Sequence, residues 1–272
     1  MAERAFRFSV GIHSAKSLIA LQDKAKHLED SGFDALHLPD HLGAPAPFPV
    51  LTAIAAATST VRLGTYVLNA GFYKPALLAR DAAEVDQLSG GRLDVGLGAG
   101  YVREEFEAAE LPYPSARQRV DYLEHVTTYI EKHLPSVPIL IAGNGNRLLT
   151  IAAQHADIIG LTGANPGDVA DPLAERVEFV RSAAGDRFAD LELNLAITAV
   201  PSDNSGKPDL ALTRRFVDLS DEELLALPSV LSGSPRDIAD TLRGYRDTYG
   251  VTSFTFQENH VDTIAKVIAE FN

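Results

Sequence analysis

Residues 61–100 decide the fold, and their sequence is VRLGTYVLNAGFYKPALLARDAAEVDQLSGGRLDVGLGAG. The run 61–68 is rich in aliphatic and β-branched residues, as expected for a buried strand. Pro75 can open a helix at its first position, and Ser89-Gly90-Gly91 can end that helix. Between these signals, the apolar residues that share one helical face are Leu78, Ala82, Val85 and Leu88. A second apolar run, 92–97, follows at once, so the stretch predicts two parallel strands joined by a helix.

The same alternation of short apolar runs and amphipathic segments extends over the whole chain of 272 residues. We predict eight strands, at 6–12, 33–39, 61–68, 92–97, 137–142, 157–161, 191–200 and 252–257. Two further helices have clear signals, one at 18–30 before Gly32 and one that starts at Ser234-Pro235 and ends near Gly250. Eight βα units favour a closed barrel, because doubly wound sheets usually have about five or six strands. The sequence therefore predicts an α/β protein with one domain over 1–272, a (β/α)8 TIM barrel.

The composition excludes several classes of partner. Acidic residues outnumber basic ones by 37 to 24, and no long basic run offers a surface for a phosphate backbone, so nucleic acid is not an expected partner. The absence of cysteine excludes disulfides, thiolate metal sites and cysteine nucleophiles. No run approaches the roughly 18 apolar residues of a membrane span, and the first residues lack the apolar core of a signal peptide. We expect a cytoplasmic enzyme that acts on a small molecule.

The second predicted strand ends in Asp40-His41. In a parallel barrel, catalytic groups follow the C-terminal ends of the strands. An imidazole exchanges a proton near neutral pH, and an adjacent carboxylate can orient it, so His41 and Asp40 are candidate catalytic residues. Position alone supports an alternative equally well, in which Asp40 caps a turn and His41 packs at the barrel rim.

Two glycine-rich segments follow other predicted strands. The run Gly96 to Gly100 alternates glycine with small apolar residues, which would let a flat ring approach the backbone. A crowded barrel strand can also need glycine for packing alone. The segment Gly143-Asn144-Gly145-Asn146-Arg147 precedes a predicted helix, whose free N–H groups could take a phosphate. The pattern alone favours an ordinary strand-to-helix turn there.

Residue spacing argues against metal and Schiff-base chemistry. His37 and His41 would lie about 13 Å apart on an extended strand, too far to share one ion. No predicted strand or strand end carries the lysine that an aldolase of this fold needs. We therefore expect no metal site.

Seven ordered blocks resemble the luciferase-like monooxygenase superfamily of flavin- and deazaflavin-dependent barrels. They are GFDALHLPDH (32–41), LGTYVL (63–68), KPALLAR (74–80), DQLSGGR (86–92), GLGAGY (96–101), PILIAGNG (138–145) and ADIIG (156–160). The segment GSP (233–235) with its following helix also resembles the family's penultimate helix. Asp40-His41 and the loop after the third strand resemble the F420-dependent branch more than the branch that uses flavin mononucleotide (FMN).

The resemblance implies a role for each matching residue. His41 would lie by the reactive edge of the tricyclic coenzyme ring as a proton donor or acceptor, with Asp40 beside it. A bulge at Tyr66-Val67, often a non-proline cis peptide, would support the ring face from behind. The turn 143–147 would take the coenzyme phosphate, and Thr162-Gly163 would flank the tail. The expected cofactor-binding residues are Tyr66, Val67, Asn69, Gly98, Gly100, Tyr101, Gly143, Asn144, Gly145, Asn146, Thr162 and Gly163.

The implied activity is an oxidoreductase that transfers a hydride between coenzyme F420 and a small organic substrate. An FMN-dependent monooxygenase or reductase of the same fold, and a non-catalytic member of the family, are the alternatives. Two departures keep these open: 117–137 is almost all helical, without the family's frequent insertion, and Tyr101 stands where relatives often have tryptophan. We expect the loops 44–49, 104–115 and 203–208 to select the substrate. Family analogy also implies a homodimer.

Overall fold

The computed structural model describes residues 5–14, 16–163 and 170–271. Nine strand segments lie in one parallel sheet, and they are β1 (Arg7–Gly11), β2 (Ala35–Leu38), β3 (Arg62–Thr65), β4 (Leu68–Asn69), β5 (Leu93–Gly98), β6 (Ile139–Ala142), β7 (Ile158–Leu161), β8 (Glu192–Ala196) and β9 (Val251–Phe256). The sheet closes because β3 pairs with β2 on one side and with β5 on the other. Since β3 and β4 are two parts of one interrupted strand, the described segments fill eight places around the barrel. The predicted fold is therefore confirmed.

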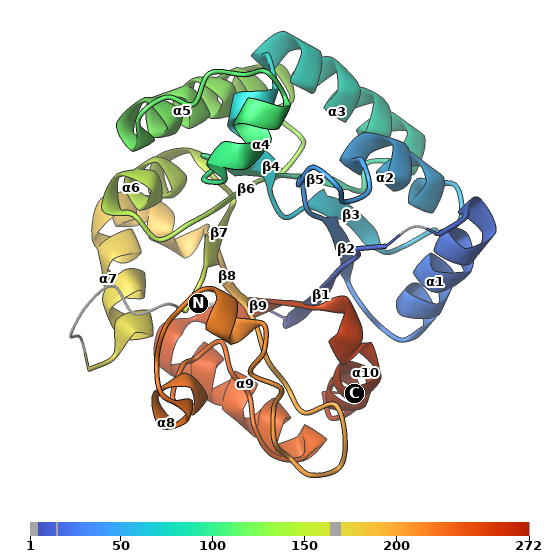
Figure 1. Cartoon of the computed structure of the whole chain (residues 1–272), viewed down its shortest axis with the longest axis vertical. Helices are drawn as coiled ribbons and strands as arrows, with labels where there is room; N and C mark the ends of the chain where they lie inside the picture. The colour runs from blue at the N-terminus through green and yellow to red at the C-terminus, as the bar shows by residue number, and fades with distance from the viewer. Residues whose placement is uncertain (1–4, 15, 164–169, 272) are drawn as a thin grey trace.

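Helices surround the barrel, as Figure 1 shows. They are α1 (Leu18–Asp30), α2 (Pro47–Ala55), α3 (Pro75–Ser89), α4 (Arg103–Ala108), α5 (Ala116–His133), α6 (Asn146–His155), α7 (Pro172–Ala184), α8 (Asp221–Leu225), α9 (Pro235–Tyr249) and α10 (Val261–Ala269). Four short 3-10 helices accompany them in the described residues: η1 (Ala70–Phe72), η2 (Gly185–Ala189), η3 (Thr213–Arg215) and η4 (Glu258–His260). None of the helices that the structure describes is both long and apolar enough to pass through a bilayer.

The helix signals in the sequence act as predicted. Pro75 is the first residue of α3, and Gly90 ends it in the left-handed conformation with φ 75°. Ser234 forms a capping box with Asp237 at the start of α9, where its hydroxyl accepts the Asp237 N–H. Helix α5 fills 116–133, which agrees with the predicted lack of an insertion there.

Two predicted strands differ from the observed ones. The predicted strand 61–68 is interrupted, because a cis peptide between Tyr66 and Val67 separates β3 from β4. The predicted strand 191–200 ends at Ala196 in β8, since the backbone beyond it leaves the barrel for the long connection 197–234. This connection has a small apolar core of its own, formed by Ala199, Leu224, Leu227 and Val230.

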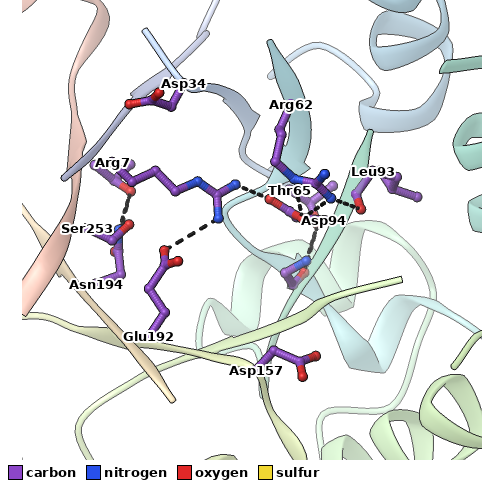
Figure 2. A network of polar contacts seen from close by, with 12 residues as sticks. Arg7, Asp34, Arg62, Thr65, Leu93, Asp94, Asp157, Glu192, Asn194 and Ser253 are labelled. Carbon is purple, nitrogen blue, oxygen red and sulfur yellow. Dashed lines mark hydrogen bonds and ion pairs between the residues drawn. The ribbon is translucent and has the colours of Figure 1, made fainter. Parts of the chain in front are cut away.

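Buried charges close the N-terminal end of the barrel (Figure 2). Asp94 on β5 is only 2% exposed and lies between the guanidinium groups of Arg7 and Arg62. Burial alone would raise the pKa of Asp94, but the two guanidinium groups outweigh it and hold that pKa below its ordinary value. Arg7 also reaches Glu192 on β8 at 3.4 Å. Because these side chains fill the barrel interior at this end, the interior is accessible from the other end, where the C-terminal strand ends meet.

Candidate active site

A cavity of about 540 Å³ opens at the C-terminal ends of the strands. Its wall brings together most of the site residues that the sequence predicts. The predicted residues that line it are Asp40, His41, Tyr66, Val67, Asn69, Gly98, Gly100, Tyr101, Gly143 and Thr162. Asn144, Gly145 and Asn146 lie just outside it on the turn before α6, and Gly163 is buried behind Thr162 against Pro228 and Ser229. Residues 164 and 165, which follow Thr162-Gly163 after the predicted strand 157–161, are outside the described residues.

The bulge at Tyr66-Val67 forms one wall of the cavity. Its cis peptide agrees with what the family resemblance implies. The Tyr66 hydroxyl donates to Asn194 Oδ1 at 2.9 Å, and the Asn194 amide donates to Ser253 and Thr255 inside the barrel. Burial raises the pKa of Tyr66 above its ordinary value, so its hydroxyl stays protonated as a donor. The bulge is thus anchored to strands β8 and β9 on the far side of the barrel.

Gly96 and Gly98 of β5, and Gly100 just after it, fit against this bulge and β4, which supports the packing explanation of their pattern. A Cβ on Gly96 would lie 1.8 Å from the carbonyl oxygen of Thr65, and one on Gly98 would lie 2.7 Å from Val67 Cγ2. A Cβ on Gly100 would lie 2.2 Å from Asn69 Oδ1. Packing against the bulge and β4 therefore favours glycine at these positions. The sequence pattern alone was equally consistent with glycines that let a flat ring approach the backbone.

His41 is paired with a residue that the sequence analysis did not single out. Its Nδ1 lies 2.9 Å from Glu105 Oε1 on α4, and the Tyr101 ring meets it edge-on with centroids 6.3 Å apart. The His41 side chain is 46% exposed, so it is not the packed rim residue of the alternative interpretation. Helix α4 brings Glu105 back over the cavity from the predicted substrate loop 104–115. An imidazole beside a carboxylate can exchange a proton with a ligand in the cavity.

Asp40 contributes differently from the prediction. Its carboxylate accepts the backbone N–H of Asn69 at 3.0 Å and the hydroxyl of Tyr73, so it fixes the start of η1. Burial raises the pKa of Asp40, although these two hydrogen bonds and His41 oppose the rise. The adjacent carboxylate was expected to orient His41, but the ring instead bonds to Glu105. The turn-capping alternative thus describes Asp40 well and His41 poorly.

The turn before α6 is held by a buried arginine. Gly145 is the N-cap of α6, and because glycine has no side chain it cannot accept a hydrogen bond from the first N–H groups of the helix. The guanidinium of Arg176 on α7 donates to the Asn144 carbonyl at 3.1 Å and to Asn146 Oδ1 at 2.6 Å. Arg147, which belongs to the predicted phosphate turn, instead turns to Asp121 and Glu124 on α5. The support of this turn therefore comes from Arg176, which lies far away in the sequence and is itself paired with Glu175.

The connection between β8 and α9 completes the cavity, although no sequence motif in it indicated such a role. Its lining side chains are Thr198, Thr213, Phe216, Val217, Leu227 and Ser229. Of the predicted substrate loops, only 104–115 supplies a lining residue, Glu105. Among the described residues, no three histidine or acidic side chains are close enough together to hold a metal ion.

The comparisons with known proteins agree with this geometry. The sequence profile of the family "Luciferase-like monooxygenase" matches residues 5–217. A 5,10-methylenetetrahydromethanopterin reductase of Archaeoglobus fulgidus is 29% identical over 54% of this chain and 50% of its own length. An F420-dependent glucose-6-phosphate dehydrogenase of Nakamurella multipartita is 26% identical over 84% of this chain and 83% of its own.

Solved structures match almost the entire chain. The coenzyme F420 dependent tetrahydromethanopterin reductase of Methanopyrus kandleri has a TM-score of 0.76 and 18% identity, with 99% of this chain and 100% of that one covered. The long-chain alkane monooxygenase LadA has a TM-score of 0.77 and 13% identity, covering 98% of this chain and 92% of its own. At these identities the structures establish the fold, and the matched profile spans most of the sequence. The chain belongs to the luciferase-like monooxygenase family.

Proposed function

We propose that this protein is an F420-dependent oxidoreductase that transfers a hydride to or from a small organic substrate. The observation that carries the proposal is the convergence of His41, the Tyr66-Val67 bulge and Gly143 on one cavity at the strand ends. Two relatives support the choice of coenzyme, because an F420-dependent dehydrogenase is among the similar sequences and an F420-dependent reductase among the similar structures.

The cavity suits a planar coenzyme ring together with a substrate. Its volume of about 540 Å³ lies within the usual range for small-molecule sites. Val67 and Leu68 provide an apolar wall, and Ala99 and Ala142 keep neighbouring strand ends free of bulky side chains. A flat, largely apolar ring would replace water along these surfaces and gain from their burial. The residues present therefore fit a deazaflavin.

The turn before α6 would hold the phosphate of the coenzyme. The first N–H groups of α6 carry the positive end of the helix dipole, and Arg176 fixes the turn through Asn144 and Asn146. These residues lie outside the cavity, where a charged group keeps contact with water. The tail of the coenzyme would continue past Thr162 and Gly163.

His41 would exchange the proton that accompanies the hydride. In a carbonyl reduction, the reduced coenzyme supplies a hydride to the carbonyl carbon and is itself oxidised. One proton must then reach the carbonyl oxygen, giving an alcohol, and His41 can deliver it from Nε2 when its ring carries a proton on both nitrogens. Glu105 accepts a hydrogen bond from Nδ1 and leaves Nε2 of His41 for the substrate.

Coenzyme titration of single-tryptophan variants tests the proposal. The chain contains no tryptophan, so Tyr101→Trp places one fluorophore at the cavity, and Tyr249→Trp places another at the end of α9 as a control. F420 should quench the first variant saturably and leave the second almost unchanged. Quenching by FMN alone would instead favour an FMN enzyme, and quenching by neither would favour a non-catalytic member.

The role of His41 needs a separate measurement. His41→Ala should bind F420 with little change but lose about a hundredfold in hydride transfer, the usual scale of general acid–base catalysis. Unchanged turnover in this variant would reject the assignment while leaving the coenzyme site intact.

A cytoplasmic location and a homodimer stay predictions from the family resemblance. Analytical ultracentrifugation of the purified protein would test the homodimer.

A further inference from the structure

The cavity contains acidic groups without the cations that an anionic substrate would need. Its described lining residues include two carboxyl groups, Asp40 and Glu105, and one imidazole, His41, and no lysine or arginine is among the described residues that line it. Residues 164–169, which follow Gly163 in the sequence as ANPGDV, contain no lysine or arginine either. A phosphate or carboxylate in this cavity would lose hydration and approach two carboxyl groups, which is unfavourable.

Two arginines on the surrounding segments, Arg119 and Arg214, have other partners. Arg119 on α5 donates to the carbonyl groups of Gly100 and Pro114, at 2.8 and 2.6 Å. Arg214 in η3 pairs with Asp221 at the start of α8. Both guanidinium groups are thus bound to the protein itself, and neither lines the cavity.

The mouth of the cavity is instead lined by exposed aromatic side chains. Tyr101 is 68% exposed and Phe216 is 62% exposed, although both line the cavity. They come from opposite parts of the sequence, the β5–α4 loop and the β8–α9 connection. Val217 and Leu227 continue the apolar surface inward. Apolar side chains grouped at the mouth of a pocket mark a surface that an apolar ligand would cover.

The remaining polar groups on this side satisfy one another. Thr198 Oγ1 lies 2.9 Å from Thr213 Oγ1 and 3.3 Å from Ser229 Oγ. These three hydroxyls belong to three parts of the connection 197–234. Because they are neutral and already bonded together, they do not require a charged ligand.

We propose that the substrate is an uncharged, mainly apolar molecule whose one reacting polar group, a carbonyl or hydroxyl, lies beside His41. This inference rests on the proposed function and specifies its substrate class. It separates this chain from the similar dehydrogenase of Nakamurella multipartita, whose name indicates glucose 6-phosphate. The same cavity that accepts a ketone such as 2-decanone should reject a sugar phosphate.

Competition against a neutral dye measures this preference without turnover. Nile red would be bound to the F420-loaded protein and displaced with either 2-decanone or glucose 6-phosphate. We expect 2-decanone to displace the dye at a concentration at least about tenfold lower, equivalent to about 1.4 kcal/mol. Equal or stronger displacement by glucose 6-phosphate would overturn the inference.

A matched pair of lysine variants tests whether the preference for an uncharged ligand arises from the cavity lining. Phe216→Lys replaces an apolar lining residue by a cation, and Leu225→Lys makes the same change at a leucine on α8 that is 46% exposed and does not line the cavity. Both positions are exposed, so folding should persist. The first variant should weaken 2-decanone binding about fivefold and improve binding of glucose 6-phosphate. The second should change neither, and equal effects of the two variants would count against the proposed site.

The order of measurement separates this inference from the proposed function. F420 binding is measured first, through the coenzyme absorbance. If F420 does not bind, the proposed function fails and the substrate class fails with it. If F420 binds but the sugar phosphate is preferred, only the substrate class is wrong.

Discussion

Replacing Gly98 by alanine tests why the cavity wall contains glycine. The added Cβ would lie 2.7 Å from Val67 Cγ2, about 0.7 Å inside the shortest ordinary contact of 3.4 Å. The next atoms are 3.8 Å away or further, so Val67 is the main obstacle to the new methyl group. Because Val67 is β-branched and belongs to the bulge, it cannot easily rotate away.

The expected cost follows from this overlap. Overpacking a well-filled site costs about 1–3 kcal/mol, and alanine recovers up to about 1 kcal/mol through its lower backbone freedom in the unfolded chain. We therefore expect Gly98→Ala to lower the free energy of unfolding by about 1–2 kcal/mol. For a chain of this size, the melting temperature should fall by about 3–6 °C. Urea and thermal unfolding of the coenzyme-free protein would measure both quantities.

Two further variants make the result specific. Val67→Ala removes the methyl group in conflict, so the double variant should recover about 1–2 kcal/mol relative to the sum of the single changes. Gly145→Ala is the control, because nothing lies within 4 Å of its added Cβ, and the effect should stay within about 0.5 kcal/mol.

The opposite outcome would refute this reasoning. If glycine at 98 served only the approach of a coenzyme ring, Gly98→Ala would weaken F420 binding but leave the coenzyme-free protein as stable as before. An additive double variant would likewise show that Val67 is not the group that requires glycine here.

Three other variants test the remaining parts of the site and the fold. Glu105→Gln should lower hydride transfer about ten- to hundredfold by weakening the His41 hydrogen bond, as judged against Glu104→Gln on the same helix, which should keep its rate. Arg176→Lys should weaken F420 binding about tenfold, since an ammonium group cannot hold the turn and both carboxylate oxygens of Glu175 at once, and an unchanged dissociation constant would exclude this support. Burial lowers the pKa of His260 from 6.5 to about 4, so its contribution to stability is complete above pH 6.5 and is lost as the pH falls, because only the unfolded chain then takes up the proton. Between pH 7.5 and 5, His260 should contribute about 2 kcal/mol to the loss measured by urea unfolding. The loss in His260→Gln should be smaller by about that amount, while the buried His37, whose pKa is lowered to about 3, still contributes.

The barrel was predictable because its signals are local. Runs such as 92–97 are apolar over the length of one strand, and Pro75 and Ser234 mark helix starts within a few residues. Parallel strands joined by such helices leave few arrangements, and eight of them favour closure. The interruption at Tyr66-Val67 has no comparable signal, since both residues suit a strand, and only the family resemblance indicated it.

The site was less predictable where its contacts join distant segments. Glu105 lies on a helix and not at a strand end, so a search along strand ends did not single it out as the partner of His41. Arg147 stands in the predicted phosphate turn by sequence, but acidic groups on α5 draw its side chain away. Arg176 takes its place from α7, and nothing in the local sequence marks it. Such substitutions of one cation for another depend on packing between helices that periodicity does not determine.

The distribution of charge explains how a cavity poor in cations could serve a coenzyme that carries phosphate. At the closed end, Arg7 and Arg62 neutralise Asp94 within the barrel. At the open end, Arg176 supports the turn from outside the cavity and is itself paired with Glu175. The proposed phosphate site and the proposed substrate site are therefore electrostatically separate. A substrate that carried its own phosphate would be drawn to the turn and away from His41, whereas an uncharged substrate would compete with the coenzyme for neither charge nor position.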